Sequence, residues 1–230
     1  MTSNQTKPDF NYEILPDDYI RYDLTFKIII IGDSGVGKSS ITKKGTKNIF
    51  EESYNATIGF EFFTFNININ DKIIRLQIWD TCGQELYRSL ISNYYRNSSL
   101  AIIVYAVNST DSFENIEMWL RQIRKNSSPD TKVFLIANKI DLTSERKISK
   151  KEGESFAQQN NLTYFMETSA KKGINCENMF VEIAKILYDD YLRHKNEDDM
   201  SSDASSQRLS TKKMKSKTKD NYKNKKGGCC

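Results

Sequence analysis

The residues with the clearest chemistry lie at positions 32–39, which have the sequence Gly-Asp-Ser-Gly-Val-Gly-Lys-Ser. This matches the pattern G-x-x-x-x-G-K-[ST], in which a glycine-rich turn directs backbone N–H groups at phosphate oxygens. Lys38 is placed to reach the β- and γ-phosphates of a nucleotide, and Ser39 to hold Mg²⁺. A purely structural turn is the alternative interpretation, but the apolar segment before the pattern favours phosphate binding. The expected contacts are Asp33, Ser34, Gly35, Val36, Gly37, Lys38, Ser39 and Ser40.

A second polar stretch points to the base, which the phosphate pattern does not identify because kinases and ATPases share it. Residues 138–141 have the sequence Asn-Lys-Ile-Asp and follow an apolar segment. A carboxylate at Asp141 can accept hydrogen bonds from N1–H and the 2-amino group of guanine, whereas adenine has no donor at that edge. A polar loop at a strand end is the alternative. Further base contacts are expected from Asn138, the alkyl stem of Lys139, the backbone N–H groups of Ser169, Ala170 and Lys171, and the ring of Phe50, whose alternative role is that of a core aromatic.

Short apolar segments alternate with amphipathic ones, and this pattern predicts an α/β fold that positions both stretches. Residues 26–31 are continuously apolar after Lys27, as in a strand buried on both faces. Asn70-Asp71 predicts a hairpin turn, and Ser149 with Glu152 forms a capping box before a helix. We expect a six-stranded, mostly parallel sheet with one antiparallel edge strand and helices on both faces. The strands are expected at residues 26–31, 61–68, 73–80, 100–107, 133–137 and 163–167.

Basic residues are concentrated near the C-terminus. The chain has a net charge of +4, yet residues 208–226 contain nine Lys and Arg and a single acid, Asp220, so the rest is net acidic. From residue 195 onward the composition is polar and predicts a disordered linker, which ends in Cys229 and Cys230. We expect this tail to contact an anionic membrane. Nucleic acid is not expected as a partner, because Tyr222 is the only aromatic among the basic residues.

Composition also excludes several classes of function. His194 is the only histidine, which excludes His-based catalytic triads and His-based metal sites. No apolar run approaches the roughly 20 residues of a membrane-spanning helix. The N-terminus is polar and carries both charge signs, unlike a signal peptide. We therefore expect a cytosolic chain with reduced cysteines.

Taken together and in this order, the motifs resemble those of the Ras superfamily and specifically of the Rab family. The resemblance implies a Ras-like P-loop G domain at residues 22–194 that binds GTP and GDP as a monomer. It leaves an N-terminal extension at residues 1–21, which we expect to be flexible, and a disordered hypervariable tail at residues 195–230. The matching stretches are residues 32–39, Thr57-Ile58-Gly59-Phe60-Glu61-Phe62, Trp79-Asp80-Thr81-Cys82-Gly83-Gln84-Glu85, Tyr94-Tyr95-Arg96, Asn138-Lys139-Ile140-Asp141 and Glu167-Thr168-Ser169-Ala170-Lys171.

The resemblance also implies roles for residues that spacing alone does not assign. Thr57 would complete the Mg²⁺ shell with Ser39 when GTP is bound, and Asp80 would hold the ion through a water. The N–H of Gly83 would contact the γ-phosphate, and Gln84 would orient the attacking water as the catalytic residue. An effector surface is implied at Ile58, Gly59, Phe60, Phe62, Trp79 and Tyr94, although aromatics at strand positions are more often part of a core.

The same resemblance implies a membrane-anchored switch in vesicle traffic. Cys229 and Cys230 would each carry a geranylgeranyl group, attached by a transferase with an escort protein. Two lipid chains and a basic stretch give lasting membrane binding. The protein would act on the cytoplasmic face of endomembranes or the plasma membrane, with a cytosolic pool. Its other partners would be an exchange factor, a GTPase-activating protein, a dissociation inhibitor and effectors.

Five residues depart from the family pattern, among them Thr42 in place of a large apolar residue of the first helix, and none is a ligand of nucleotide or metal. Cys82 replaces alanine, Leu86 a basic residue and Ala106 an aspartate. Gly45 replaces a large apolar residue and is expected to weaken the first helix by about 0.5–1 kcal/mol relative to alanine. Two other functions remain open, namely a GTP-binding module with negligible hydrolysis, which Gln84 argues against, and a P-loop ATPase or kinase.

Overall fold

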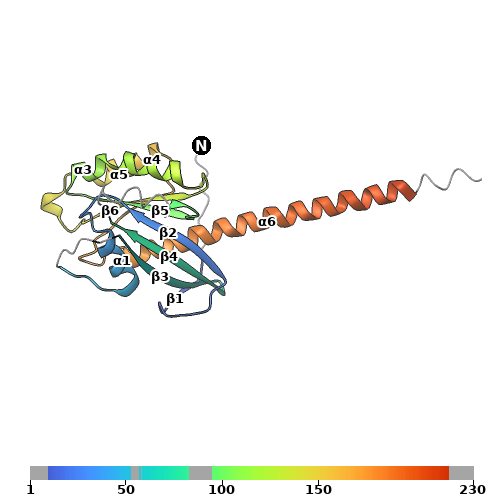
Figure 1. Ribbon diagram of the computed structural model, residues 1–230, viewed down its shortest axis with the longest axis horizontal. Helices are drawn as coiled ribbons and strands as arrows, with labels where there is room; N and C mark the ends of the chain where they lie inside the picture. The colour runs from blue at the N-terminus through green and yellow to red at the C-terminus, as the bar shows by residue number, and fades with distance from the viewer. Residues whose placement is uncertain (1–9, 53–56, 58, 83–94, 218–230) are drawn as a thin grey trace, which may run out of the picture. The chain divides into compact units, whose positions relative to one another are not determined.

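The computed structural model describes residues 10–52, 57, 59–82 and 95–217, which form a seven-stranded sheet with helices on both faces (Figure 1). Residues up to Leu187 belong to one compact unit, and from Tyr188 onward the described chain is the distal part of the last helix. The strands are β1 (Tyr12–Leu15), β2 (Leu24–Ile31), β3 (Phe60–Ile69), β4 (Lys72–Thr81), β5 (Leu100–Ala106), β6 (Lys132–Asn138) and β7 (Tyr164–Glu167). The helices are α1 (Lys38–Lys47), α3 (Thr110–Glu114), α4 (Ile116–Asn126), α5 (Lys150–Gln159) and α6 (Cys176–Lys217), with a 3-10 turn, η2 (Thr143–Glu145).

The sheet has the strand order β1-β3-β4-β2-β5-β6-β7. Strands β4, β2, β5, β6 and β7 are parallel, and β3 pairs antiparallel with β4. The β3–β4 hairpin turns at Asn70 and Asp71, whose φ angles of 49° and 63° are those of a type I′ turn. The predicted hairpin, its turn and the capping box of Ser149 and Glu152 are therefore confirmed.

The prediction of six strands is wrong by one, because β1 pairs antiparallel with β3 at the edge of the sheet. Tyr12–Leu15 also fall in the segment expected to be flexible. A four-residue strand is too short for its alternation to be recognised in the sequence, and its pairing depends on a strand far along the chain. A cation–π contact supports it, since the ammonium of Lys185 lies 4.4 Å from the ring centre of Tyr12.

Between β1 and β2 the chain forms what we call the N-terminal strap, residues 16–23. The buried side chain of Asn66 donates hydrogen bonds to the main-chain oxygens of Pro16 at 2.7 Å and Asp17 at 3.2 Å. The guanidinium of Arg75 donates to the main-chain oxygen of Tyr19. These contacts fix the strap on the β3–β4 hairpin, because a buried amide left without its acceptors would be costly.

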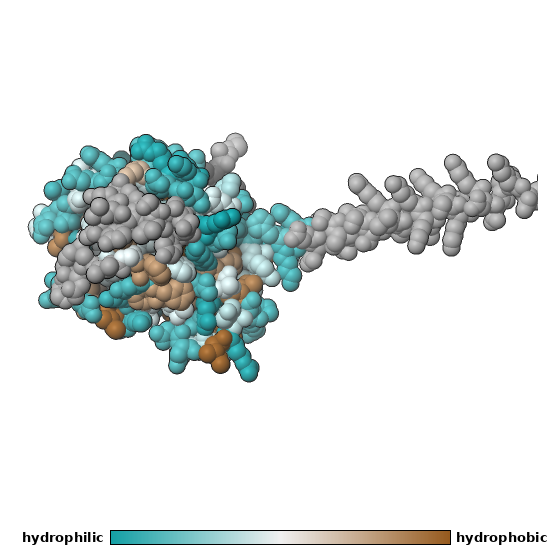
Figure 2. Space-filling view, viewed as in Figure 1, coloured by the Kyte–Doolittle hydropathy of each residue, from teal (hydrophilic) through white to brown (hydrophobic). Residues whose placement is uncertain are grey.

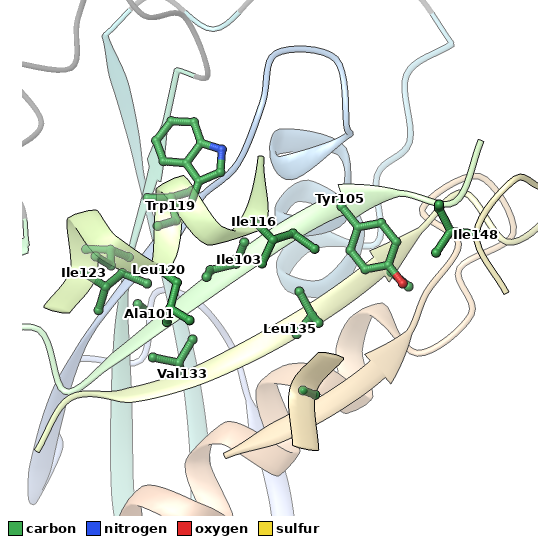
Figure 3. Packing of buried hydrophobic residues seen from close by; sticks show 14 of the residues in the cluster. Ala101, Ile103, Tyr105, Ile116, Trp119, Leu120, Ile123, Val133, Leu135 and Ile148 are labelled. Atoms are coloured by element: carbon green, nitrogen blue, oxygen red, sulfur yellow. The ribbon is translucent and has the colours of Figure 1, made fainter. Parts of the chain in front are cut away.

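A hydrophobic core lies between the sheet and helices α4 and α5 (Figure 3). Alternate residues of the parallel strands, such as Ile103, Tyr105 and Leu135, pack against Trp119 and Leu120 of α4. The predicted helical spacing from Phe113 to Ile123 is interrupted at Asn115, which separates α3 from α4. This core holds the carboxyl ends of β2, β5 and β6 rigidly, and the candidate site residues follow those ends.

The opposite face of the sheet is covered by α1 and the beginning of α6, which approach each other closely at Gly45. A β-carbon at this position would lie 2.5 Å from the main-chain oxygen of Cys176 and 2.7 Å from the ring of Phe180. The helix preference for alanine therefore does not decide stability at residue 45. Glycine is needed there because the two helices touch through it.

Helix α6 continues to Lys217, so the linker predicted from residue 195 is helical over much of its length. The Ser- and Asp-rich composition favours coil, but extending an existing helix requires no new nucleation. Within the distal part, Arg193 pairs with Asp189 one turn earlier. None of the described helices combines the length and the apolar composition needed to cross a bilayer.

Candidate functional site

The loop between β2 and α1 is shaped by glycines in conformations that other residues rarely adopt. Gly32 has φ 138°, and a β-carbon on it would lie 2.2 Å from the main-chain oxygen of Val104. Gly37 has φ 95° and begins α1, so the loop opens directly onto a helix N-terminus. Unpaired backbone N–H groups at such a terminus favour an anion. Of the other loop residues, Ser34 and Gly35 are exposed, Val36 is buried and Ser40 lies in α1.

Lys38 is a buried cation at the centre of this loop, with only 5% of its surface exposed. Its ammonium donates to the main-chain oxygens of Gly32 at 2.8 Å and Asp33 at 2.7 Å. Burial lowers the pKa of Lys38 to about 8, while the carboxylates of Asp80 and Asp33 act in the opposite direction. A buried ammonium held by neutral carbonyls gains stability when an anion is bound beside it.

A second group of side chains suits a hard cation. The hydroxyls of Ser39 and Thr57 lie 2.7 Å apart. Asp80 is fully buried, and neither carboxylate oxygen has a hydrogen-bond partner of ordinary geometry among the described residues. Burial raises the pKa of Asp80 to about 6, opposed by the nearby Ser39 hydroxyl and the Lys38 ammonium. A bound cation would neutralise the charge of this buried carboxylate, so the donor set fits Mg²⁺.

This group contains one carboxylate and two hydroxyls. No cluster of three or more His, Cys, Asp or Glu side chains occurs in the described part of the chain. Mg²⁺ in proteins commonly takes one or two carboxylates and completes its shell with waters and substrate phosphates. The position of Asp80 beside the phosphate-type loop of Lys38 is consistent with that arrangement.

The side chain of Asn138 connects three parts of the site at the end of β6. Its amide nitrogen donates to the main-chain oxygen of Val36 at 2.8 Å. Its amide oxygen accepts from the hydroxyl of Thr168 at 3.2 Å and from the N–H of Ala170 at 3.4 Å. The structure therefore brings together the two loops that the sequence assigned to phosphate and base.

Asp141 is oriented by the neighbouring loop. The hydroxyl of Ser169 donates to its carboxylate at 2.5 Å and accepts from the N–H of Lys172 at 3.0 Å. Lys139 has φ 67°, and burial lowers its pKa while Asp141 and Glu145 oppose that shift. The carboxylate and the lysine stem thus lie beside the same loop, as base binding requires.

The remaining predicted base contacts differ in how far the structure supports them. Ala170 is buried, and the exposed Lys171 pairs loosely with Glu52 at 3.7 Å. Phe50 follows the left-handed C-cap of α1 at Asn48 and is partly buried. Its stacking on a base stays a prediction.

Three predicted effector residues form an aromatic cluster on the outer strands. The ring centre of Trp79 lies 5.2 Å from that of Phe60 and 5.4 Å from that of Phe62. Phe60 is 43% and Phe62 48% exposed, which excludes the alternative that they are core residues. The face in Figure 2 is mostly hydrophilic with small hydrophobic areas, so exposed aromatics are notable on this protein. Next to them, the main-chain oxygen of Gly59 accepts from the N–H of buried Cys82 at 3.0 Å.

Two further residues contact the phosphate-type loop and were not predicted from the sequence. The carboxylate of Asp33 accepts a hydrogen bond from the side-chain amide of Asn115 at 2.7 Å and from the indole of Trp119 at 2.8 Å. Both donors belong to the start of α4, more than 80 positions along the chain. The helical spacing of Trp119 indicates only a core residue, so its polar contact could not be predicted. Ile58, Gly83, Gln84, Leu86, Tyr94, Cys229 and Cys230 lie outside the described residues.

Comparison with known proteins agrees with this geometry. The Ras family model matches residues 27–189. The Ras-related protein RABA1h of Arabidopsis thaliana is 46% identical over 167 residues, which are 73% of this chain and 76% of that protein. The Ras-related protein RIC2 of rice, Oryza sativa subsp. japonica, is 41% identical over 209 residues, which are 91% of this chain and 94% of that protein. The Ras-related protein Rab11B of Nicotiana tabacum is 43% identical over 167 residues, covering 73% and 76%.

Proposed function

Because the chain belongs to the Ras family and, within it, to the Rab small GTPases, we propose that it is a membrane-anchored switch in vesicle traffic. In this proposal it binds GTP and GDP with Mg²⁺, hydrolyses GTP slowly and recruits effectors in the GTP state. An exchange factor and an activating protein drive the cycle.

One observation carries the proposal more than any other. The buried carboxylate of Asp80 has no hydrogen bond of ordinary geometry among the described residues and lies near the buried ammonium of Lys38. A buried anion and a buried cation are each costly unless compensated. A nucleotide phosphate with its Mg²⁺ compensates both at once, which a metal or an anion alone would not do.

The preference for guanine rests on Asp141. Its carboxylate is oriented by Ser169, while Asn138 holds the same loop against the phosphate loop. Guanine offers two donors to a carboxylate, and adenine would leave it unpaired in a partly dry site. This argument separates the proposal from a P-loop ATPase or kinase.

The switch depends on Thr57. Its hydroxyl lies beside that of Ser39, so both can face the same ion. In the proposal, Mg²⁺ supplies neutralisation of the charge on the β- and γ-phosphates. Loss of the γ-phosphate removes contacts that keep Thr57 beside Ser39, and the segments around Thr57 and Gly83 relax. Gln84 orients the attacking water, and a partner supplies the charge that makes hydrolysis fast.

The membrane part of the proposal rests on the tail sequence. Cys229 and Cys230 are geranylgeranylated with the help of an escort protein and a transferase, and a dissociation inhibitor extracts the lipidated protein. The basic residues from 208 to 226 add attraction to an anionic leaflet. Effectors dock on the cluster of Phe60, Phe62 and Trp79, two of which are exposed aromatics suited to that role.

The proposal is tested by identifying the nucleotide on purified protein, after acid release and chromatography, and by following added GTP over hours with Mg²⁺. Bound GDP and slow conversion of GTP are expected. Bound GTP that persists even with activating proteins would instead favour a binding module without hydrolysis. Equal affinity for ATP and GTP would overturn the guanine assignment.

A further inference from the structure

Asp33 brings a negative charge into a loop that we expect to bind phosphates. Its main-chain oxygen accepts from the ammonium of Lys38 at 2.7 Å, so its backbone is part of the phosphate cradle. Its carboxylate, if it turned towards the cradle, would repel a phosphate and compete for Lys38. The loop therefore needs something to keep this side chain turned away.

That role is filled by the start of α4. The amide of Asn115 donates to Oδ2 of Asp33 at 2.7 Å, and the indole of Trp119 donates to Oδ1 at 2.8 Å. Each carboxylate oxygen thus has a neutral donor, and both donors come from one helix. We propose that Asn115 and Trp119 are positioning residues for nucleotide binding, which hold the charge of Asp33 away from the phosphates. The inference rests on the proposed function and adds two residues to it.

The local structure indicates that these donors are not accidental. Asn115 is the N-cap of α4, a place where asparagine normally accepts from the first turn, yet its side chain makes no capping hydrogen bond. Its amide reaches Asp33 instead. The ring of Trp119 is 2% exposed and packs in the core, where a buried indole N–H requires an acceptor. Figure 3 shows Trp119 at the edge of the cluster, with its nitrogen directed away from Leu120 and Ile123.

The charge of Asp33 is also close enough to affect the cradle. The ammonium of Lys38 lies 2.7 Å from the main-chain oxygen of Asp33, so the carboxylate of the same residue lies close to that charge even when it is turned towards α4. Released from its donors, the carboxylate would lie nearer to Lys38 in some of its rotamers. The binding of GDP and the binding of GTP would both be weakened, because both nucleotides carry the β-phosphate.

The test is the rate at which full-length protein releases N-methylanthraniloyl-GDP into excess GDP with Mg²⁺. Asn115→Ala removes one donor without removing a cap, and should speed release about tenfold, since hydrogen bonds to charged groups are the stronger kind. Glu114→Ala is the matched control, because this neighbouring residue is also exposed, whereas the described side-chain donors to the Asp33 carboxylate are Asn115 and Trp119. Trp119→Phe should have an effect of similar size.

A core substitution could act through packing alone, so each change is repeated with Asp33→Asn. If the freed charge is responsible, Asn115→Ala and Trp119→Phe should change the release rate of Asp33→Asn protein less than twofold. Equal effects with and without the carboxylate would overturn the inference and leave Trp119 a core residue. If Trp119→Phe fails to fold, the exposed Asn115 still decides the question.

The wild-type protein separates this inference from the function on which it rests. Failure of the wild type to bind guanine nucleotide would contradict the proposed function. Normal binding by the wild type, with release from Asn115→Ala equal to that from Glu114→Ala, would contradict only the positioning role.

Discussion

The side-chain amide of Asn138 donates to the main-chain oxygen of Val36 across 2.8 Å, which links the end of β6 to the loop before α1. A β-carbon on Gly37 would lie 2.4 Å from that amide nitrogen, so the approach leaves no room for a larger residue. The segments assigned to base and phosphate are therefore held together by a direct contact.

Asn138→Ala should weaken GTP and GDP alike. The change removes the bond to Val36 and leaves the Thr168 hydroxyl and the Ala170 N–H without their acceptor. Buried groups left unpaired cost about 1–3 kcal/mol, which corresponds to roughly a 5- to 150-fold loss of affinity. Equilibrium titration with fluorescent GTP and GDP measures the loss. An effect on one nucleotide only would contradict a purely structural link.

Asp141→Asn should exchange guanine for xanthine. The mutant amide can donate where the carboxylate accepted, and xanthine has an acceptor where guanine has its amino group. GTP affinity should fall by at least about tenfold while xanthosine triphosphate gains, since a site built for hydrogen bonds rejects analogues that lack them. Competition between the two nucleotides measures the switch. Unchanged GTP affinity would place the base elsewhere.

The requirement for Mg²⁺ should depend on pH through Asp80. Burial raises the pKa of this carboxyl to about 6, and the metal binds only its ionised form. Below that pH, protons compete, and the Mg²⁺ concentration that half-maximally slows GDP release should rise about tenfold per pH unit. In Asp80→Asn protein only the nucleotide itself titrates, so this variant supplies the baseline for the pH dependence of the Mg²⁺ requirement. Identical pH profiles for the two proteins would show that Asp80 does not hold the ion.

Lower pH weakens Mg²⁺ binding through Asp80, but in protein without nucleotide or metal the same raised pKa makes folding more favourable at low pH. The folded-state pKa lies above the ordinary aspartate value of 3.8, so the contribution of Asp80 to stability is fully present at low pH and is lost as the pH rises through about 6. As the pH falls from about 7 to about 5, the free energy of unfolding of nucleotide-free wild-type protein should therefore rise relative to that of Asp80→Asn protein. Urea denaturation at several pH values measures that difference.

Gly45→Ala should destabilise the protein. Helix propensity alone predicts a gain of about 0.5–1 kcal/mol. The added carbon would lie 2.5 Å from the Cys176 oxygen and force α1 and α6 apart, and overpacking of this kind typically costs about 1–3 kcal/mol. The two mechanisms give opposite signs, so a single urea denaturation curve decides between them. Increased stability would mean that α6 can shift at little cost.

Asn66→Ala should release the N-terminal strap. The amide holds two main-chain oxygens of the strap and its own oxygen accepts from Arg75 at 2.9 Å, so the expected cost is about 1–3 kcal/mol. Asn68→Ala is the control, because the side-chain oxygen of Asn68 is buried and has no hydrogen-bond partner among the residues that the structure describes. In protein lacking residues 1–17 the effect of Asn66→Ala should shrink. An undiminished effect would show that the strap is not what Asn66 stabilises.

Much of the fold follows from local sequence signals. The central parallel strands β2, β5 and β6 contain continuous apolar runs, and Asn70-Asp71 is a turn that two left-handed residues allow, so these elements were predicted within a few residues. Strand β1 was missed because four residues carry little signal without β3. The length of α6 was missed because composition reports the tendency of isolated segments, while this helix continues from a packed one.

The residues of the candidate site likewise fall into a group that could be predicted from the sequence and a group that could not. Lys38, Asp80 and Asn138 belong to contiguous motifs at strand ends, where parallel strands bring their residues together. The contacts of Asp33 with Asn115 and Trp119, and of Gly45 with Cys176, join segments far apart in the sequence. From residue type and spacing alone, Asn115 would be taken for a residue inside a helix and Trp119 for a core aromatic. Gly45 would be taken for a position that weakens its helix. Only the packed structure relates them to one another.

The first part of the strap is held through its main chain, whereas Asp23 at its end is also held through its carboxylate, which accepts from the N–H of Ile73 at 2.8 Å. Asn66, Thr64 and Arg75 reach the main-chain oxygens of Pro16, Asp17 and Tyr19, and these oxygens are present whatever side chains the strap carries. Substitutions at the exposed Asp17, Asp18 and Ile20 thus leave the attachment intact. This part of the surface can accumulate mutations at little cost to folding, which makes it a place where closely related copies of the gene can diverge in surface chemistry while keeping one architecture.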